Sequence, residues 1–354
     1  MRHITFRITA TVVALLLAGT ACSDDDTAST TTTAPPVGTS TTATTAAPVA
    51  QAPEEPFRGF SLSPVDYEGD SLVEFLETAP LNADAIARVG DILEWEESEG
   101  SGLAVVDGLA EEYGYLPLSV VGIFDVGDGE LLRPLDDETF DRYVAAAGSY
   151  AGNHLPPYLG LGVEINTQWR AHPDEFDRFV ELFAAVAAVV EEVSPQTQLF
   201  TVFQLEHMAG LHGGLFGGTN DPLLAEWELI DRFPDADIIA FTTYPGLVFP
   251  HPNGIPDDYY TQLNERAGGR PIAFTEMGWQ SEGEYAEYSG TPEKQAAFVE
   301  RFAELTADAD MAFYIWSFLY DQQTFGPFAS MGLVDRARQP KLGWWVWQDQ
   351  GVSE

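Results

Sequence analysis

The segment Arg270–Ser281, RPIAFTEMGWQS, places a carboxylate at the end of an apolar strand. Pro271 is followed by Ile272–Thr275, which suit a buried strand, and Glu276 comes directly afterwards. A carboxylate at such a position has to be solvated, hydrogen-bonded or paired. In a parallel barrel, this end of a strand is where active sites are built. The segment therefore predicts a site residue at Glu276; the alternative is an acid that only caps the following helix.

The rest of the chain, residues 57–354, alternates short apolar runs with amphipathic stretches. This alternation is typical of βα units around a parallel sheet, and a body of this length suits a single (β/α)8 TIM barrel. The expected strands are 57–62, 91–95, 116–124, 158–165, 198–205, 238–243, 271–275 and 311–318. The expected helices are 71–77, 103–113, 136–150, 173–193, 223–233, 257–266, 292–307 and 341–348.

The expected strand 158–165 carries a second carboxylate toward the same end of the barrel. Period-two alternation places Gly160, Gly162, Glu164 and Asn166 on one face and aliphatic residues on the other. Small residues that lead up to a carboxylate and an amide suit the crowded interior of a barrel. An inward Glu164 needs a partner or a function. A structural salt bridge is the alternative, although basic residues are scarce in this chain.

Two carboxyl groups on either side of one bond are the usual equipment for glycoside hydrolysis. When they lie about 5–5.5 Å apart, one acts as the nucleophile and the other as the acid/base. Their surroundings must then separate the two pKa values, so that one group is charged and the other protonated. Glu276 and Glu164 are the candidate pair.

Four segments resemble the clan of retaining (β/α)8 glycoside hydrolases, in which catalytic Glu residues end strands 4 and 7. They are FTEMGW around Glu276, IIAFTTYP (238–245), AFYIWSFLYD (312–321) and SMGLVDRARQPKLGWWVW (330–347). The endo-β-1,4-galactanase-like or related families are the most similar. The resemblance implies Glu276 as nucleophile and Glu164 as acid/base. It also implies that Tyr244 bonds the nucleophile and that Trp316 floors the sugar subsite.

The chain departs from this clan immediately before Glu164. Clan members usually carry Asn there, which binds the sugar 2-hydroxyl, whereas this chain has Val163. Such hydrogen bonds strengthen in the transition state and contribute several kcal/mol. The expected replacements are Asn166, Gln204 or Asn153. A different alignment would move the acid/base role to Glu206 in TVFQLEH.

Aromatic residues gather after the expected strand ends, where sugars stack on rings. This group holds Trp95, Trp169, Trp279, Trp316, Tyr320 and Phe325. Trp95, Trp279 and Trp316 are the candidates that we assign to the site, and ordinary packing is the alternative. The predicted substrate-binding set is Tyr244, Trp316, Trp279, Asn166, Gln204, Glu206 and Trp95.

The charge balance limits the classes of partner. The chain has 56 acidic and 16 basic residues and a net charge of −40, which disfavours nucleic acids and polyanionic glycans. A neutral oligo- or polysaccharide is the expected partner. The single Cys22 excludes an intramolecular disulfide, and His207 and His212 read as ordinary loop residues. We therefore expect no metal and no cofactor, and a monomer.

The N-terminus predicts export. Residues 1–21 combine a basic start, an apolar run too short to span a bilayer and a small-residue exit that ends on Cys22. This pattern resembles a bacterial lipoprotein signal, although Gly19 stands where Leu is preferred. Residues 22–56 are a Thr/Ala/Pro-rich linker that cannot bury enough surface to order. The expected location is the cell surface, with lipidated Cys22 in the membrane; cleavage after Ala21 and secretion is the alternative.

These patterns together predict a retaining glycoside hydrolase that acts on a neutral β-linked glycan. A catalytically inactive, carbohydrate-binding surface lipoprotein on the same barrel is the main alternative, and Val163 is its main support. A barrel of unrelated chemistry with a structural Glu276 is the third hypothesis.

Overall fold

A computed structural model describes residues 52–53, 55–96 and 102–350 of the chain. Three predicted features lie outside these residues: the leader 1–21, the lipidation site Cys22 and nearly all of the linker 22–56. Among the residues that are described, no helix is long and apolar enough to span a bilayer.

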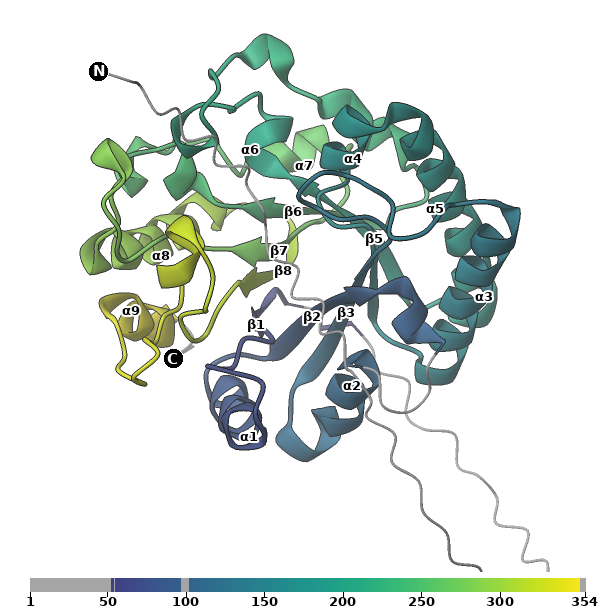
Figure 1. Cartoon of the computed structure of the whole chain (residues 1–354), viewed down its shortest axis with the longest axis horizontal. Coiled ribbons are helices and arrows are strands. Elements are labelled where there is room, and N and C mark those ends of the chain that lie inside the picture. The colour runs from purple at the N-terminus through teal and green to yellow at the C-terminus, as the bar shows by residue number, and fades with distance from the viewer. Residues whose placement is uncertain (1–51, 54, 97–101, 351–354) are drawn as a thin grey trace, which may run out of the picture.

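Eight parallel strands close into a barrel in the order in which they occur in the chain (Figure 1). The prediction of a (β/α)8 barrel is confirmed. Strand β1 pairs with both β2 and β8, which closes the sheet. The strands are β1 Phe57–Ser61, β2 Ala85–Asp91, β3 Leu116–Gly122, β4 Tyr158–Leu161, β5 Gln198–Gln204, β6 Ile238–Thr243, β7 Ile272–Met277 and β8 Met311–Trp316.

Helices surround the barrel, as Figure 1 shows, and α3 and α5 are the longest of those in the described chain. Several helices begin at side chains that cap them. Before α8, Thr291 accepts a hydrogen bond from Lys294 N, and before α3, Asp136 accepts one from Thr139 N. The helices are α1 Gly69–Thr78, α2 Gly102–Tyr113, α3 Asp137–His154, α4 Ile165–Ala171, α5 Pro173–Val193, α6 Leu205–Met208, α7 Gln262–Arg266, α8 Pro292–Thr306 and α9 Leu342–Gln350.

Aromatic rings fill the interior of the barrel. Phe313 lies 5.3 Å from Phe57 and 5.5 Å from Phe200, measured between ring centroids. Gly160 makes room for this plug, because a Cβ at that position would lie 2.6 Å from the Phe200 ring. The small residue expected on the inner face of β4 is therefore required by a neighbouring ring. The plug closes the barrel below the strand ends, so that a site can form only above it.

The second strand differs from its prediction. It was expected at 91–95 but runs over Ala85–Asp91, and Ile92–Trp95 form a short 3-10 helix. A capping box ends the strand: the Asp91 carboxylate accepts from Leu93 N at 2.9 Å, and Glu94 accepts from Asp91 N at 3.2 Å. These two side chains satisfy the backbone donors that a continuing strand would have paired. The apolar residues after Asp91 therefore belong to a helical turn.

The fourth strand ends earlier than predicted. It stops at Leu161, and both Gly162 (φ 88°) and Glu164 (φ 51°) have left-handed backbone conformations before α4 begins. The alternation that predicted a common inner face therefore stops at Gly162. Val163 packs into the inner cluster, and Asn166 belongs to a helix.

Two predicted helices are largely absent. The stretch expected at 223–233 forms two 3-10 helices, Pro222–Leu224 and Trp227–Arg232, separated by an extended break. At the break, Glu226 N donates to Met208 O at 2.9 Å and the Glu226 carboxylate pairs with Arg170. These contacts hold the chain out of a continuous helix. The helix expected at 257–266 is reduced to α7.

Candidate active site

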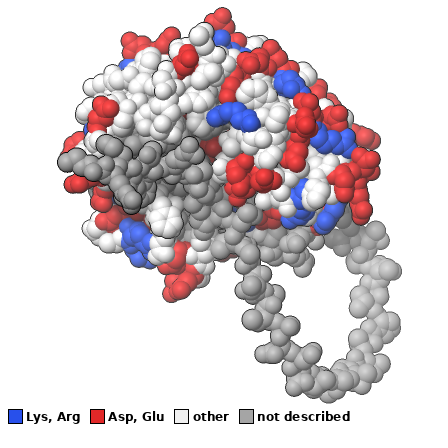
Figure 2. Space-filling view, turned by 45° about the horizontal axis from the view of Figure 1, so that its top comes forward, with Lys and Arg blue, Asp and Glu red and all other residues white. Residues whose placement is uncertain are grey.

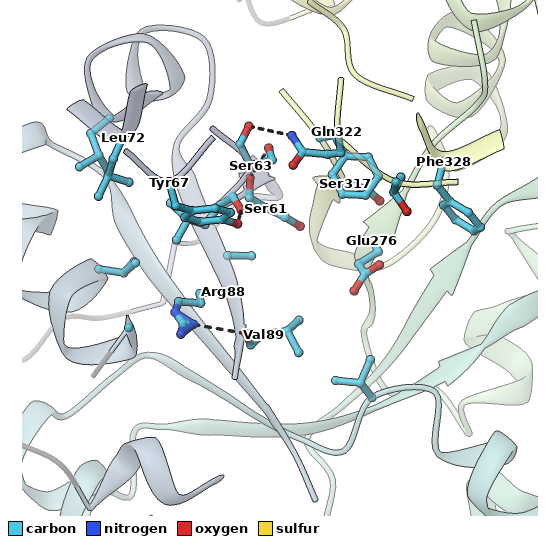
Figure 3. Close-up of a pocket in the computed structure, with 18 of the residues that line it drawn as sticks. Ser61, Ser63, Tyr67, Leu72, Arg88, Val89, Glu276, Ser317, Gln322 and Phe328 are labelled. Atoms are coloured by element: carbon cyan, nitrogen blue, oxygen red, sulfur yellow. Dashed lines mark hydrogen bonds between the residues drawn. The ribbon is translucent and has the colours of Figure 1, made fainter. Parts of the chain in front are cut away.

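Glu276 lies near the end of β7 and faces a cavity at the carboxyl end of the barrel (Figure 3). Tyr244, which follows β6, donates from its hydroxyl to Glu276 Oε2 at 2.5 Å. The same hydroxyl lies 3.0 Å from Ser317 Oγ, just after β8. Burial raises the pKa of Glu276, and the hydrogen bond from Tyr244 opposes that rise. The tyrosine therefore orients the carboxylate and favours its charged form.

Glu164 follows the kink after β4, and its side chain is buried with 3% of its surface exposed. Thr242 Oγ1 donates to Glu164 Oε1 at 2.6 Å. The pKa of Glu164 is raised to about 8: burial is the main cause, the negative charge of Glu276 adds to the rise, and the bond from Thr242 opposes it. Glu164 is therefore protonated at neutral pH.

The backbone at Glu164 is strained. A residue other than glycine with φ near +51° costs about 1–2 kcal/mol, and such strain is held in place by the surrounding structure, often at functional sites. Here the left-handed turn aims the side chain across the strand ends toward Thr242 on β6. A strand that continued straight to residue 165 would not place the carboxyl group in this way.

The two carboxyl groups open into one cleft. Glu276 lines a cavity of about 290 Å³, and Glu164 lines an adjoining cavity of about 330 Å³. Val126, Tyr244 and Phe328 form walls of both cavities, which makes them neighbouring parts of a single cleft. Cavities of this size are typical of small-molecule and sugar sites.

The part of the cleft at Glu164 is polar, and we name it the polar arm. Arg170 in this arm is paired with Glu226 at 2.8 Å. Burial and the nearby Arg170 lower the pKa of His207 to about 3, so that this ring is neutral at physiological pH. The polar arm offers hydroxyl, amide, imidazole and carboxyl groups, which suit the hydroxyls of a sugar. Its polar residues are Asp128, Glu164, Thr167, Arg170, Gln204 and His207.

The part of the cleft beyond Glu276 is apolar, and we name it the aliphatic arm. It lies over β1 and β2 and between α1 and α2, where no site was predicted. The sequence analysis missed this arm because it placed the second strand at 91–95. Arg88 and Val89, which lie on β2, were therefore not recognised as residues near a site. Leu62, Leu72, Leu76, Val89, Val105, Val106 and Leu109 form its aliphatic lining.

Glu206, the alternative acid/base, lines neither cavity and is fully buried. Its carboxylate accepts hydrogen bonds from Gln204 Nε2 (2.6 Å), Thr243 Oγ1 (2.9 Å), Tyr259 OH (3.0 Å) and Tyr244 N (3.1 Å). Because one of these donors is the backbone of Tyr244, Glu206 fixes the tyrosine that orients Glu276. The structure thus places Glu206 behind the site.

The three candidate tryptophans lie outside the cleft. Trp316 is fully buried, and its Nε1 donates to Met331 O at 2.9 Å. On β8, Phe313 and Ile315 face the barrel interior, so that Trp316 faces the helices and Ser317 reaches the cavity instead. Trp279 packs on Phe298 with ring centroids 5.4 Å apart. The floor implied by the resemblance is therefore not formed by Trp316.

Trp95 also belongs to the packing between barrel and helices. Its Nε1 donates to Ser119 Oγ at 3.0 Å, and its ring stacks on Tyr150 with centroids 5.4 Å apart. The aromatic residues that do line the cleft are Tyr67, Tyr244, Phe318 and Phe328, together with Phe216 in the polar arm. Of these, only Tyr244 was predicted. Phe328 comes two residues before the segment 330–347 that resembles the clan. This position was the available signal that Phe328 lies near the site.

The amides expected to replace the missing Asn are engaged elsewhere. Asn166 is buried, accepts from Gln204 N at 2.9 Å and donates to Glu226 at 3.3 Å. Gln204 lines the polar arm, but its amide bonds Glu206 and His207 N. Asn153 lies exposed on α3 and contacts Ser149. Beside Glu276, the position of the missing amide is occupied by the aliphatic side chain of Val163.

Within residues 52–53, 55–96 and 102–350, no three His, Cys, Asp or Glu side chains are grouped as metal ligands. The functional groups of the cleft are the Glu164 carboxyl group, the Glu276 carboxylate held by Tyr244, and the side chains of the two unlike arms.

No protein-family model matches this sequence, and no curated protein matches it. Solved structures share its fold. An exo-β-1,4-mannosidase from an Opitutaceae bacterium superposes with a TM-score of 0.58 at 16% identity, over 85% of this chain and 59% of that one. GH5_18 from Bifidobacterium longum, in complex with Manβ1-4GlcNAc, gives 0.56 at 16% identity over 84% and 78%.

A β-glucuronidase from Bifidobacterium dentium, complexed with a coumarin glucuronide, is a third example. It gives a TM-score of 0.53 at 16% identity over 84% of this chain. The present chain spans about half of that protein, 46% of its length. At these identities, the similarity establishes the common barrel.

Proposed function

We propose that this protein is a retaining glycoside hydrolase that cleaves a β-linked glycan by double displacement. The observation that carries the proposal is the pair of buried carboxyl groups at the ends of β4 and β7. They open into one cleft, and burial raises the pKa of both, that of Glu164 to about 8, whereas the hydrogen bond from Tyr244 opposes the rise at Glu276. The barrels of the mannosidase, GH5_18 and the glucuronidase support it as neighbours of the same fold.

In the first step, Glu276 attacks the anomeric carbon of the sugar. The carbon–oxygen bond to the leaving group breaks, and the proton of Glu164 passes to the departing oxygen. The sugar is then esterified to Glu276, and Glu164 is left as a carboxylate. The hydrogen bond from Tyr244 at 2.5 Å holds the attacking carboxylate in place. Thr242 holds the acid in reach of the leaving oxygen.

In the second step, Glu164 acts as a base. Its carboxylate takes a proton from a water molecule whose oxygen attacks the anomeric carbon, and the bond to Glu276 breaks. Glu164 is protonated again and Glu276 is charged again, so that the cycle closes. Its protonation in the free enzyme, with a pKa of about 8, provides the starting state.

A neutral substrate fits the charges. Asp and Glu side chains are scattered over the visible face of the molecule among fewer Lys and Arg side chains (Figure 2), and the net charge is −40. The two arginines of the cleft are both paired, Arg170 with Glu226 at 2.8 Å and Arg88 with Glu94 at 2.8 Å. Among the described residues, the cleft therefore offers a sugar carboxylate no arginine that lacks an acidic partner, which favours a neutral glycoside over a glucuronide.

A carbohydrate-binding protein without activity is the second candidate. Val163 favours it, because this side chain cannot donate to a sugar hydroxyl where the clan has an amide. The candidate shares the proposed cell-surface location, with lipidated Cys22 as the membrane anchor. If a Cys22→Ala variant stays in the membrane fraction, lipidated Cys22 is not the membrane anchor.

A substrate panel separates the two candidates. Aryl β-glycosides and neutral polysaccharides are incubated with the wild-type protein and with Glu276→Gln, and product release is followed. Release by the wild type and its loss in the variant support the hydrolase. Binding by both proteins without release by either supports the inactive carbohydrate-binding protein.

A further inference from the structure

The aliphatic arm is continuous with the space in front of Glu276. One cavity of about 290 Å³ reaches from Glu276, Tyr244 and Ser317 to the side chains between α1 and α2. Figure 3 shows Leu72, Tyr67, Arg88 and Val89 on one side of this space and Glu276 on the other. A ligand whose reacting carbon lies at Glu276 can therefore extend into the aliphatic arm.

The chemistry of the two carboxyl groups says which part of the substrate lies there. Glu164 gives its proton to the leaving group, which places the leaving group in the polar arm. The sugar attacked by Glu276 lies on the other side of the broken bond. Whatever extends from Glu276 away from Glu164 is therefore part of the glycone, or is attached to it.

The walls of the aliphatic arm suit an apolar chain better than another sugar. Val105 is 42% exposed, and Leu72 and Val89 are partly exposed although Val89 lies within a barrel strand. A sugar hydroxyl placed against leucine and valine would lose its hydrogen bonds to water without replacement. A hydrocarbon group would instead be favoured by burial.

Three polar side chains of this arm already have partners within the protein. Tyr67 OH donates to Leu62 O at 3.1 Å, and Gln322 Nε2 donates to three backbone carbonyls, of which Tyr320 O is the closest at 2.7 Å. Arg88 is paired with Glu94 at 2.8 Å, which offsets its charge, and its Nε is buried. These bonds leave the hydrocarbon walls as the dominant feature.

We propose that the substrate is a β-glycoside whose glycone carries an acyl chain, and that the aliphatic arm binds this chain. This inference rests on the proposed function for the direction of the substrate, and it adds the substrate class. The chain would pack between α1 and α2, while the leaving group occupies the polar arm.

Binding measurements test the arm separately from catalysis. Mono-O-octanoyl methyl β-glycosides with gluco, galacto and manno configuration are titrated calorimetrically against the wild-type protein, beside their unsubstituted parents. Each buried methylene contributes about a fourfold gain in affinity, so that we expect at least a tenfold gain for one octanoyl ester. Equal affinity of every ester and its parent, or no binding of any ester, would overturn the proposal.

Two matched valines supply the control. Val105 and Val73 are both 42% exposed, on α2 and α1, but only Val105 lines the aliphatic arm. Val105→Asp is expected to abolish the gain from the octanoyl group, and Val73→Asp to preserve it. A second variant, Val89→Thr, keeps the shape of the side chain and should reduce the gain. Equal effects of Val105→Asp and Val73→Asp would contradict binding in this arm.

Catalytic failure has a different signature. If the octanoyl ester binds tighter and Val105→Asp removes this gain, but no glycoside is hydrolysed, the proposed hydrolase is wrong and the acyl site stands. If simple glycosides are hydrolysed but the ester gives no gain in binding or in kcat/KM, the hydrolase stands and the acyl site is wrong.

Discussion

The polar arm and the aliphatic arm differ in how their side chains are held. In the polar arm, Glu164 is fixed by Thr242, and Arg170 is paired with Glu226. In the aliphatic arm, Val89 and Leu72 are partly exposed and pack against other apolar side chains. Directional bonds position a reacting group, whereas apolar walls accept ligands of varied shape. We therefore propose that the polar arm serves proton transfer and that the aliphatic arm selects the substrate.

The largest expected effect belongs to the carboxylate where the arms meet. Glu276→Gln removes the nucleophile and should lower kcat on the aryl glycoside found by the panel by about 10⁴-fold or more. The exposed Glu287, in a short 3-10 helix between β7 and α8, provides the matched control as Glu287→Gln. Similar rates for the two variants would remove Glu276 from the mechanism.

Replacing the acid of the polar arm should have the next largest effect. Glu164→Gln removes general acid/base catalysis, and kcat/KM should fall by about 10²–10⁴-fold. In the wild type, kcat/KM should decline as pH rises through about 8, because only protonated Glu164 can donate. The decline should be absent from the residual activity of the variant. A basic limb that survives in Glu164→Gln would belong to another group.

The same carboxyl group predicts a pH dependence of stability. Because the folded pKa of Glu164 lies above its unfolded value, the folded state binds the proton more tightly. The contribution of protonated Glu164 to the free energy of unfolding is fully present below the pKa of Glu164 in the unfolded chain. It is lost as pH rises through about 8, the pKa in the folded state. Glu164→Gln should therefore raise the free energy of unfolding more at pH 9 than at pH 5. Denaturant unfolding at both pH values measures this, and an equal change would contradict it.

The tyrosine at the junction should have an intermediate effect. Tyr244→Phe removes the hydroxyl that donates to Glu276, and we expect a loss of about 10–100-fold in kcat. Because this bond lowers the pKa of Glu276, its removal should move the acidic limb of kcat/KM to higher pH. An unchanged acidic limb would show that the hydroxyl does not act on the nucleophile.

The smallest expected effect is a shift of the pH profile. Thr242→Val keeps the shape of the side chain but removes the bond to Glu164 at 2.6 Å, which holds the pKa of that group down. The basic limb of kcat/KM should move to higher pH by about one unit. Val89→Thr, the reverse exchange in the wall of the aliphatic arm, is the control and should leave the basic limb of kcat/KM unchanged.

The sequence predicted the parts of the site that follow from local patterns. The carboxylate at the end of the apolar segment 272–275 pointed to Glu276, and the alternation along 158–166 pointed to Glu164; both side chains line the cleft, although β4 ends at Leu161. The resemblance to the retaining clan identified Tyr244 as the partner of Glu276. These residues are recognisable because each stands where an apolar strand ends, and polar groups at such positions require a reason.

The remaining residues depend on long-range packing. Trp316 was placed in the site by resemblance, but the inward direction of Phe313 and Ile315 turns its ring toward the helices. The left-handed backbone at Glu164 arises where β4 meets α4, and the sequence of a single strand does not reveal it. The aliphatic arm forms between two helices and β2, whose position was predicted incorrectly. Leucines and valines on amphipathic helices give no sign that a cavity lies beside them.

The central claim is that Glu276 forms a covalent ester with the sugar. A 2-deoxy-2-fluoro aryl β-glycoside of the configuration found by the panel slows the second step, so that the ester accumulates and can be located by peptide mass spectrometry. The account predicts one added sugar on the peptide that contains Glu276, and no addition in Glu276→Gln. A label on Glu164 or Glu206, or hydrolysis with inversion of the anomeric centre and no label, would contradict it.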